Sequence, residues 1–264
     1  MASSCQYDAF YYEHGCGKPY RRTEEWLAFF QGIANSILQD IQPATVLDAG
    51  CAMGFLVEGF RKRGVEAWGV DISSYAIQNV HPDIQTYCWV GSISEPFPRK
   101  YDLIVSIEVL EHVDARLAEK AVQNFCAHSD DILFSSTPFD YTEPTHRNVQ
   151  PPEYWAELFA RQGFYRDVEY DASFITNWAI RFRRSSEPVP RIIRGYERRF
   201  WHLWNENVEQ RRQRASLQES QSALEEQRAK ISELEYRLGR YENSRIIQFV
   251  NRILEIRRRR MKRP

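Results

Sequence analysis

The hydrophobic positions between residues 45 and 135 fall into short apolar runs separated by amphipathic stretches. A short apolar run between turn signals fits a buried strand, whereas apolar positions three and four residues apart fit a helix with one buried face. Strands that alternate with helices form a parallel sheet covered on both faces. The predicted strands are residues 45–49, 67–70, 86–90, 103–107 and 132–135, and the predicted helices are residues 55–63, 74–80 and 116–127.

The segments on either side of this alternation complete an α/β domain. Residues 24–40 carry apolar side chains at helical spacing, whereas residues 7–22 have no clean period and are predicted to be an irregular arm. A polar loop after the last parallel strand leads to a helix at residues 151–162, which opens with two prolines. Residues 164–170 and 178–183 are predicted to be two strands joined by a turn.

The C-terminal part of the chain has a different pattern. Residues 185–190 are a Ser- and Pro-rich linker, and residues 191–263 contain no Pro, so a largely continuous helix is predicted. Apolar residues recur every seven positions, which favours a dimeric coiled coil. A single helix folded back on the globular domain is the alternative. The heptad positions are Leu217, Leu224, Ile231 and Leu238, with Ser220, Gln227, Leu234 and Tyr241 as companions.

The last twenty residues predict a basic amphipathic helix, which can lie on an anionic membrane or on a partner protein. We therefore divide the chain into a globular domain (residues 1–186), a linker with a coiled coil (187–244) and a basic amphipathic tail (245–264). The apolar stripe of the tail consists of Ile246, Phe249, Val250, Ile253, Leu254 and Ile256, and Arg245, Arg252 and Arg257 to Arg260 surround it.

Charge divides the chain in nearly the same place. Residues 1–190 carry 16 Lys and Arg against 26 Asp and Glu, and residues 191–264 carry 19 against 10, although the whole chain has a formal net charge of −1. The acidic half argues against nucleic acid as the ligand of the globular domain, because a protein that binds nucleic acid has to neutralise phosphates. A cationic small molecule would be attracted there instead.

The five cysteines (Cys5, Cys16, Cys51, Cys88 and Cys126) are scattered without a Cys-x-x-Cys pair. This spacing fits reduced thiols better than disulfides or a zinc site, and no metal site is predicted. The N-terminus has no basic segment followed by an apolar run, and no apolar stretch is long enough to cross a bilayer. We therefore expect a cytoplasmic protein.

A glycine-rich turn follows the first predicted strand, in the sequence Val-Leu-Asp-Ala-Gly-Cys-Ala-Met-Gly of residues 46–54. Ligands of open α/β sheets bind at the carboxyl ends of the strands, where such a turn lets the backbone approach them closely. The spacing Gly50-x-Ala52-x-Gly54 differs from the Gly-x-Gly-x-x-Gly of dehydrogenases. The turn therefore indicates a ligand site of another kind, with a purely structural turn as the alternative.

Two further elements follow neighbouring strands. Asp71 comes directly after the strand at residues 67–70, where a carboxylate can accept both hydroxyls of a ribose; capping of the next helix is the alternative. The strand at residues 103–107 leads into Glu-Val-Leu-Glu-His-Val at residues 108–113. Together with the glycine-rich turn, these elements resemble class I S-adenosylmethionine-dependent methyltransferases over roughly residues 7–184.

The resemblance implies a Rossmann-like, mostly parallel seven-stranded sheet that ends in an antiparallel hairpin. It also implies S-adenosylmethionine as the cofactor, with S-adenosylhomocysteine as the product, and an N-terminal arm that closes over the cofactor. Many relatives place an acid near the adenine where this chain has Gly91-Ser92, so Ser92, backbone groups or Ile93 must serve instead. The residues implied to hold the cofactor are Tyr20, Asp48, Gly50, Gly54, Asp71, Ile72, Ser92, Ile107 and Glu108.

Two histidines are candidates for a general base, from which a hydroxyl nucleophile gains. His146 lies in a polar loop after the fifth strand and should face the acceptor, so it is the favoured base. His112 should lie closer to the cofactor and be held by Glu111. A packing role is the alternative for each. Of the remaining histidines, His81, His128 and His202 are predicted to be structural or solvated.

The polar loop at residues 141–148 suits a hydroxyl-rich acceptor. The tail, with heptads that end in Ser-Arg and Arg-Ile-Leu, resembles the tails of bacterial surface-glycan enzymes. We therefore favour O-methylation of a sugar hydroxyl in polysaccharide or O-antigen biosynthesis. A small aromatic or lipid acceptor and a non-catalytic scaffold are the alternatives. The expected partners are a glycan or small-molecule acceptor, a second copy of the chain, and a glycosyltransferase or the inner membrane surface contacted by the tail.

Overall fold

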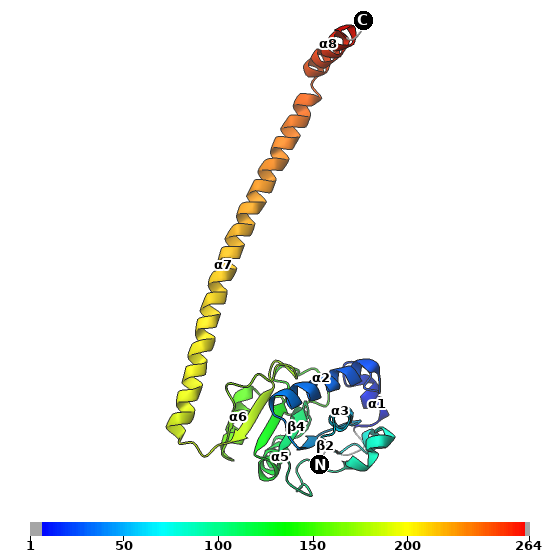
Figure 1. The fold of residues 1–264 in the computed structure, drawn as a ribbon, viewed down its shortest axis with the longest axis vertical. Helices are drawn as coiled ribbons and strands as arrows, with labels where there is room; N and C mark the ends of the chain where they lie inside the picture. Colours follow the sequence, from blue (N-terminus) through cyan, green and yellow to red (C-terminus); the bar gives the residue numbers. More distant parts are fainter. Residues whose placement is uncertain (1–6, 262–264) are drawn as a thin grey trace. The chain divides into compact units, whose positions relative to one another are not determined.

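The computed structural model describes residues 7–261 and contains a seven-stranded sheet in the order β3-β2-β1-β4-β5-β7-β6 (Figure 1). The first five strands pair in parallel, and β7 runs antiparallel between β5 and β6. This confirms the predicted Rossmann-like sheet with its C-terminal hairpin. The strands are β1 (Thr45–Ala49), β2 (Glu66–Asp71), β3 (Cys88–Val90), β4 (Leu103–Ile107), β5 (Asp131–Ser135), β6 (Phe164–Arg166) and β7 (Ile180–Arg184).

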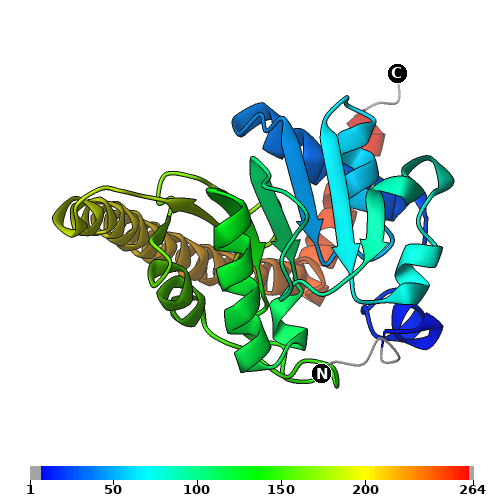
Figure 2. The same ribbon diagram turned by 90° about the horizontal axis from the view of Figure 1, so that it is seen from below.

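Helices cover both faces of the sheet (Figure 2). Buried residues of α2 and α3 pack on one face, and those of α5 and α6 pack on the other. The helices of this unit are α1 (Ala9–His14), α2 (Glu24–Asp40), α3 (Phe55–Arg61), α4 (Ser74–Gln78), α5 (Ala115–His128) and α6 (Pro152–Ala160), with short 3-10 helices η1 (Pro82–Tyr87) and η2 (Leu110–His112).

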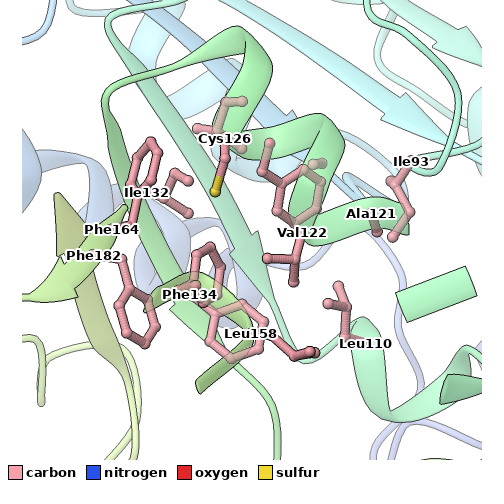
Figure 3. Packing of buried hydrophobic residues seen from close by; sticks show 14 of the residues in the cluster. Ile93, Leu110, Ala121, Val122, Cys126, Ile132, Phe134, Leu158, Phe164 and Phe182 are labelled. Carbon is pink, nitrogen blue, oxygen red and sulfur yellow. The ribbon is translucent and has the colours of Figure 1, made fainter. Parts of the chain in front are cut away.

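An aromatic core fixes the β5 side of the sheet to α6 (Figure 3). Phe134 of β5 contacts the rings of Trp155 and Phe159, and Phe159 stacks on Phe182 of β7 with ring centroids 4.1 Å apart. All four side chains are almost completely buried. Because packed interiors resist displacement, this core holds the segment that follows β5 in a defined position.

The N-terminal arm contains a helix that the hydrophobic pattern did not predict. The side chain of Asp8 accepts hydrogen bonds from the backbone N–H groups of Phe10 and Tyr11, so Asp8 caps α1. The prediction of an irregular arm was wrong here because aromatic residues at successive positions hide the helical period.

Two predicted strands are shorter than expected. Residues 86 and 87 belong to η1, so β3 begins only at Cys88. β6 ends at Arg166, after which the N–H of Tyr170 donates to the carbonyl of Asp167 in a turn. In both places Tyr residues, which favour strands, extended the predicted run into a segment that turns.

The chain divides into two compact units after Tyr196. The helix α7 (Val189–Glu242) begins in the first unit and continues into the second, which also contains α8 (Arg245–Met261). Within the first unit, the hydroxyl of Tyr196 accepts a hydrogen bond of 3.0 Å from the N–H of Arg166, which ties the first turns of α7 to β6. Val189 and Pro190 belong to α7 and not to the predicted linker, because proline is compatible with the first turn of a helix.

The predicted continuous helix is interrupted after Glu242. The hydroxyl of Ser244 accepts a hydrogen bond from the N–H of Ile247 at 3.3 Å, so Ser244 caps a new helix. Within the described residues 7–261, no helix is long and apolar enough to cross a membrane.

An ion pair ties the N-terminal arm to the sheet domain. Both terminal nitrogens of Arg22 bind the carboxylate of Glu58 on α3, one of them at 2.8 Å, and Nζ of Lys62 lies 2.7 Å from Glu58 Oε1. The side chain of Glu58 is only 4% exposed. Hydrogen bonding from Arg22 is the main reason that the pKa of Glu58 is lowered to about 2.

We expect Glu58→Gln to destabilise the protein by roughly 1–3 kcal/mol at neutral pH, because a pKa lowered this far corresponds to up to about 3 kcal/mol and solvent screens the partly exposed partners. Because the pKa of Glu58 is lower in the folded state, the ion pair stabilises the fold at pH values above the pKa of the unfolded chain, near 4.5. This contribution is lost as the pH falls toward 2. Urea unfolding of both proteins across this range measures the difference.

Glu25→Gln is the matched control, since Glu25 forms an exposed ion pair with Lys18 in the same part of the chain. Its effect should stay within about 0.5 kcal/mol. An equal loss of stability in both variants, or a Glu58 effect that does not change with pH, would contradict the role of this ion pair.

Candidate active site

A cavity of about 1180 Å³ lies at the carboxyl ends of β1 to β4. Small-molecule sites usually measure about 300–1,000 Å³, so this cavity has room for two reactants. The turns after the strands, the N-terminal arm and the loop after β5 all contribute to its walls. Every predicted site residue except Gly54 lines it: Tyr20, Asp48, Gly50, Asp71, Ile72, Ser92, Ile107, Glu108, His112 and His146.

The turn after β1 brings the backbone to the cavity wall. Gly50 has a φ of +96°, and a Cβ atom there would lie 2.3 Å from Cγ2 of Val109, so only glycine fits. Ala52 also has a positive φ, of 45°, in the position where the resemblance leads one to expect glycine. Gly54, with a φ of +72°, starts α3 and lies behind the wall, where its role is to turn the chain.

Asp71 joins the turns after β1 and β2. Its Oδ2 accepts the N–H of Ala52 and its Oδ1 accepts the N–H of Ser73, both at 2.8 Å. Each oxygen keeps a further lone pair, so the capping role and the ribose role are compatible. Burial raises the pKa of Asp71, and burial together with the neighbouring Asp71 raises the pKa of Asp48 to about 8. A positively charged ligand would favour the ionised form of both.

The N-terminal arm covers the cavity with aromatic rings. Tyr20 stacks on Phe55 with ring centroids 5.1 Å apart, and Tyr12 stacks on Tyr75 at 5.7 Å. Of the tyrosines in the arm, sequence analysis singled out only Tyr20 as a site residue, although Tyr7, Tyr11 and Tyr12 also line the cavity. The signal that could have found them is Asp8 as a helix cap directly before a run of aromatic residues.

The two candidate histidines lie side by side, with ring centroids 4.6 Å apart. Nδ1 of His112 is 2.8 Å from Oγ1 of Thr145, and that hydroxyl donates its one proton to Glu143. His112 must therefore donate from Nδ1, which leaves the lone pair of the neutral ring on Nε2. Nδ1 of His146 lies 2.8 Å from the carbonyl of Asp140, so it also donates and Nε2 is again the basic nitrogen.

This geometry differs from the expected arrangement. Thr145, and not Glu111, holds the ring of His112, and the two histidines share one end of the cavity. Burial, reinforced by the adjacent His146, lowers the pKa of His112 to about 4. At neutral pH His112 is therefore an uncharged imidazole that can accept a proton or a metal ion.

Two glutamates stand beside the histidines. Glu108 has a φ of 52°, and its Oε1 accepts a hydrogen bond of 2.9 Å from the indole of Trp178, a residue that sequence analysis did not single out. Glu111 is completely buried, and Oε2 has no hydrogen-bond partner within the described part of the chain. Burial and the neighbouring Glu108 hold the pKa of Glu111 well above its usual range.

Comparison with known proteins supports the assignment that the motifs suggested. The model of the methyltransferase domain family matches residues 20–170, which is more than half of the chain. Ubiquinone biosynthesis O-methyltransferases are similar over shorter stretches. The protein of Paracidovorax citrulli is 31% identical over 29% of this chain and 36% of its own, and that of Serratia proteamaculans is 32% identical over 36% and 42%. The chain thus spans less than half the length of these relatives.

Solved structures share the fold. The magnesium protoporphyrin IX methyltransferase of Synechocystis with bound S-adenosylmethionine superposes with a TM-score of 0.52 over 70% of this chain and 98% of its own, at 15% identity. The same enzyme with bound S-adenosylhomocysteine gives 0.50 over 60% and 83%, at 16% identity. The protein therefore belongs to the methyltransferase domain family, as its sequence motifs predicted, and it shares its fold with a methyltransferase that binds S-adenosylmethionine.

Proposed function

We propose that the protein transfers a methyl group from S-adenosylmethionine to a hydroxyl oxygen, with a sugar of a bacterial surface glycan as the favoured acceptor. The observation that carries this proposal is the pair of histidines, each with an open Nε2, at one end of a cavity that Asp71 also lines. The hydroxyl oxygen attacks the methyl carbon, the carbon–sulfur bond breaks, and S-adenosylhomocysteine leaves.

Residues at the strand ends hold the cofactor in this proposal. Asp71 accepts the two ribose hydroxyls through the lone pairs that its backbone contacts leave open. The turn at Gly50 allows a close approach, because a side chain there would clash with Val109. Ser92 and Ile93 line the cavity beside β3, where the adenine is expected, without the acid that many relatives have.

His146 is the proposed acceptor of the hydroxyl proton. Its Nδ1 is fixed by the carbonyl of Asp140, and its Nε2 lies 3.6 Å from Oε2 of Glu143. A carboxylate at this distance stabilises the imidazolium that forms when the ring takes up the proton. His112 keeps the second lone pair at the same end of the cavity and is the alternative base.

A sugar acceptor is favoured by the rim of the cavity. Phe139, which is 74% exposed, lines the cavity beside Asp140, and its ring packs against that of Trp178. Aromatic faces beside a carboxylate suit a ligand that has both C–H faces and hydroxyls. The resemblance of the tail to those of surface-glycan enzymes points to the same class of acceptor.

A small aromatic or lipid acceptor is the second candidate. Tyr7, Tyr11 and Trp178 give the acceptor end an aromatic lining, and the curated relatives are named as O-methyltransferases of ubiquinone biosynthesis. Incubation with labelled S-adenosylmethionine and a panel of oligosaccharides and phenols separates the two. Transfer to no hydroxyl acceptor would instead favour the scaffold alternative.

The proposed partner of α7 is a second copy of the chain. The heptad residues Leu217, Leu224, Ile231 and Leu238 are each about half exposed or more on a helix about 80 Å long. Burial of such a row between two copies removes apolar surface from water. The arginines and the apolar stripe of α8 suit an anionic membrane surface on the cytoplasmic side, or a glycosyltransferase.

We expect Asp71→Ala to weaken binding of S-adenosylmethionine by about 10- to 150-fold in calorimetry, because charge-assisted hydrogen bonds to the ribose contribute about 1.5–3 kcal/mol. Asp102→Ala is the matched control, since Asp102 Oδ2 also accepts two backbone N–H groups, but at the opposite end of β1. Equal affinity in folded Asp71→Ala and wild-type protein would refute the ribose assignment.

His146→Ala should lower kcat by about 10²–10⁴ and leave cofactor affinity nearly unchanged, because only proton transfer is lost. The pH–rate profile should lose the limb that reports protonation of the base. His202→Ala, in the exposed part of α7, serves as the control. Normal turnover in His146→Ala with a large loss in His112→Ala would show that the two roles are reversed.

Replacing Leu224, Ile231 and Leu238 together with glutamate should convert a dimer to a monomer in light scattering, because charges would be buried in the seam. Ser222→Glu, Ala229→Glu and Tyr236→Glu add the same charge outside the heptad positions and should leave the mass unchanged. A monomeric wild-type protein would contradict the coiled coil.

A further inference from the structure

Three side chains at the acceptor end of the cavity form a potential metal-binding cluster. Glu111, His112 and His146 each offer one ligand atom, and these atoms all lie within 4.8 Å of one another. Two of the residues follow β4 and the third follows β5, so the cluster depends on the fold and not on a sequence motif. Sequence analysis predicted no metal site because 34 residues separate the two histidines.

The hydrogen bonds of both rings are those of metal ligands. A histidine that binds a metal ion usually donates its other ring N–H to a carbonyl, carboxylate or similar acceptor, which fixes the tautomer. His146 donates from Nδ1 to the carbonyl of Asp140, and His112 donates from Nδ1 to Thr145, which in turn donates to Glu143. The Nε2 atom of each ring is therefore left as the possible ligand. Among the described residues, the hydroxyl of Tyr11 lies 3.5 Å from Nε2 of His112, at the outer limit of a hydrogen bond.

The carboxylate of Glu111 supplies an independent observation. Its side chain is 0% exposed and lines the cavity, and Oε2 has no hydrogen-bond partner among the residues that the structure describes. Among the described residues, Oε1 makes a long contact, of 3.5 Å, to the N–H of Thr137, and the Ser136 side chain is a further neighbour of the carboxyl group. A buried polar atom without a partner is costly, and a cation is the partner that would satisfy a carboxylate most strongly.

We propose that Glu111, His112 and His146 bind one divalent transition-metal ion. Two imidazoles and one carboxylate suit Zn²⁺, Mn²⁺, Fe²⁺ or Co²⁺ better than Mg²⁺ or Ca²⁺, which prefer oxygen ligands. Metal bonds of 2.0–2.2 Å place tetrahedral ligands about 3.4 Å apart, so the three side chains close by about 1 Å around the ion. Three protein ligands leave one position open for a reactant.

This inference rests on the proposed function and changes one part of it. The acceptor hydroxyl takes the open position, where the metal ion lowers its pKa, so that less basic strength is needed to remove the proton. His146 is then a ligand, and Glu143, 3.6 Å from its Nε2, becomes the group that receives the proton. The methyl transfer itself is unchanged.

Titration of the chelator-treated full-length protein with Co²⁺ tests the site without an acceptor. Co²⁺ reports its ligands by its visible spectrum, so binding to nitrogen and oxygen can be told from binding to thiolates such as Cys51 and Cys88, which lie close together behind the turn. We expect one Co²⁺ per chain with no thiolate charge-transfer band. Glu111→Gln and His146→Ala should each weaken binding by more than about 10-fold.

Two further variants make the result specific. Thr145→Val keeps the shape of the side chain but removes the acceptor of His112 Nδ1, and it should weaken binding by about 10- to 100-fold. His202→Ala should bind Co²⁺ like the wild-type protein. Circular dichroism and S-adenosylmethionine binding show that each variant is folded.

The proposal is overturned if the wild-type protein binds no Co²⁺, shows thiolate ligation, or binds it equally well in Glu111→Gln and His146→Ala. Methyl transfer at an unchanged rate in metal-free protein would also overturn it while the proposed function stands. Absence of transfer to every hydroxyl acceptor, with the Co²⁺ site intact, would instead refute the proposed function alone.

Discussion

The parallel pairing of β1 with β2 and β4 positions the rest of the site. Val46 to Ala49 pair with Ala67 to Val70 on one side, and the same strand pairs with β4 from Leu103 on the other. All three strands therefore end at one edge, where β1 is followed by the glycine-rich turn and Asp71 and Glu108 stand at the ends of β2 and β4. The N–H groups of Gly50 and Cys51 both donate to the carbonyl of Val70, and Asp71 in return accepts the N–H of Ala52. A shift in this register would separate Gly50, Asp71 and Glu108, which line one end of the cavity and form the proposed cofactor site.

A second set of backbone contacts brings the two histidines together. The carbonyl of Glu111 accepts the N–H groups of Arg147 and Asn148 at 2.8 and 2.9 Å, which joins the turn after β4 to the loop after β5. From the sequence we expected His112 to lie near the cofactor and His146 to face the acceptor. This link instead places the two rings in contact. The same link leaves Glu111 buried beside both rings. The proposed acceptor end of the cavity thus contains a small polar cluster beside the aromatic rings of Tyr7, Tyr11 and Trp178.

Local patterns were sufficient to predict the sheet and the residues at the strand ends that line the cavity, because strand ends, glycine turns and Asp71 are read directly from spacing. The structure of the N-terminal arm was harder to predict, because α1 depends on a single capping residue, Asp8. The role of its aromatic residues is visible only from their packing in the folded protein. Trp178 could not be found, because its bond to Glu108 joins residues 70 positions apart. At Ala52 the sequence showed which residue occupies the turn but not its conformation. The structure shows a left-handed backbone there, which costs about 1 kcal/mol in a residue other than glycine.

In the proposed function, one cavity holds S-adenosylmethionine at the strand ends and an acceptor hydroxyl beside the histidines. The most direct test is a crystal structure of the protein with S-adenosylhomocysteine bound. Our account predicts that the ribose hydroxyls contact the carboxylate of Asp71, that the adenine lies beside Ser92 and Ile93, and that the sulfur faces the end of the cavity with His112 and His146. A cofactor whose ribose lies away from Asp71, or whose sulfur points away from the two histidines, would contradict it.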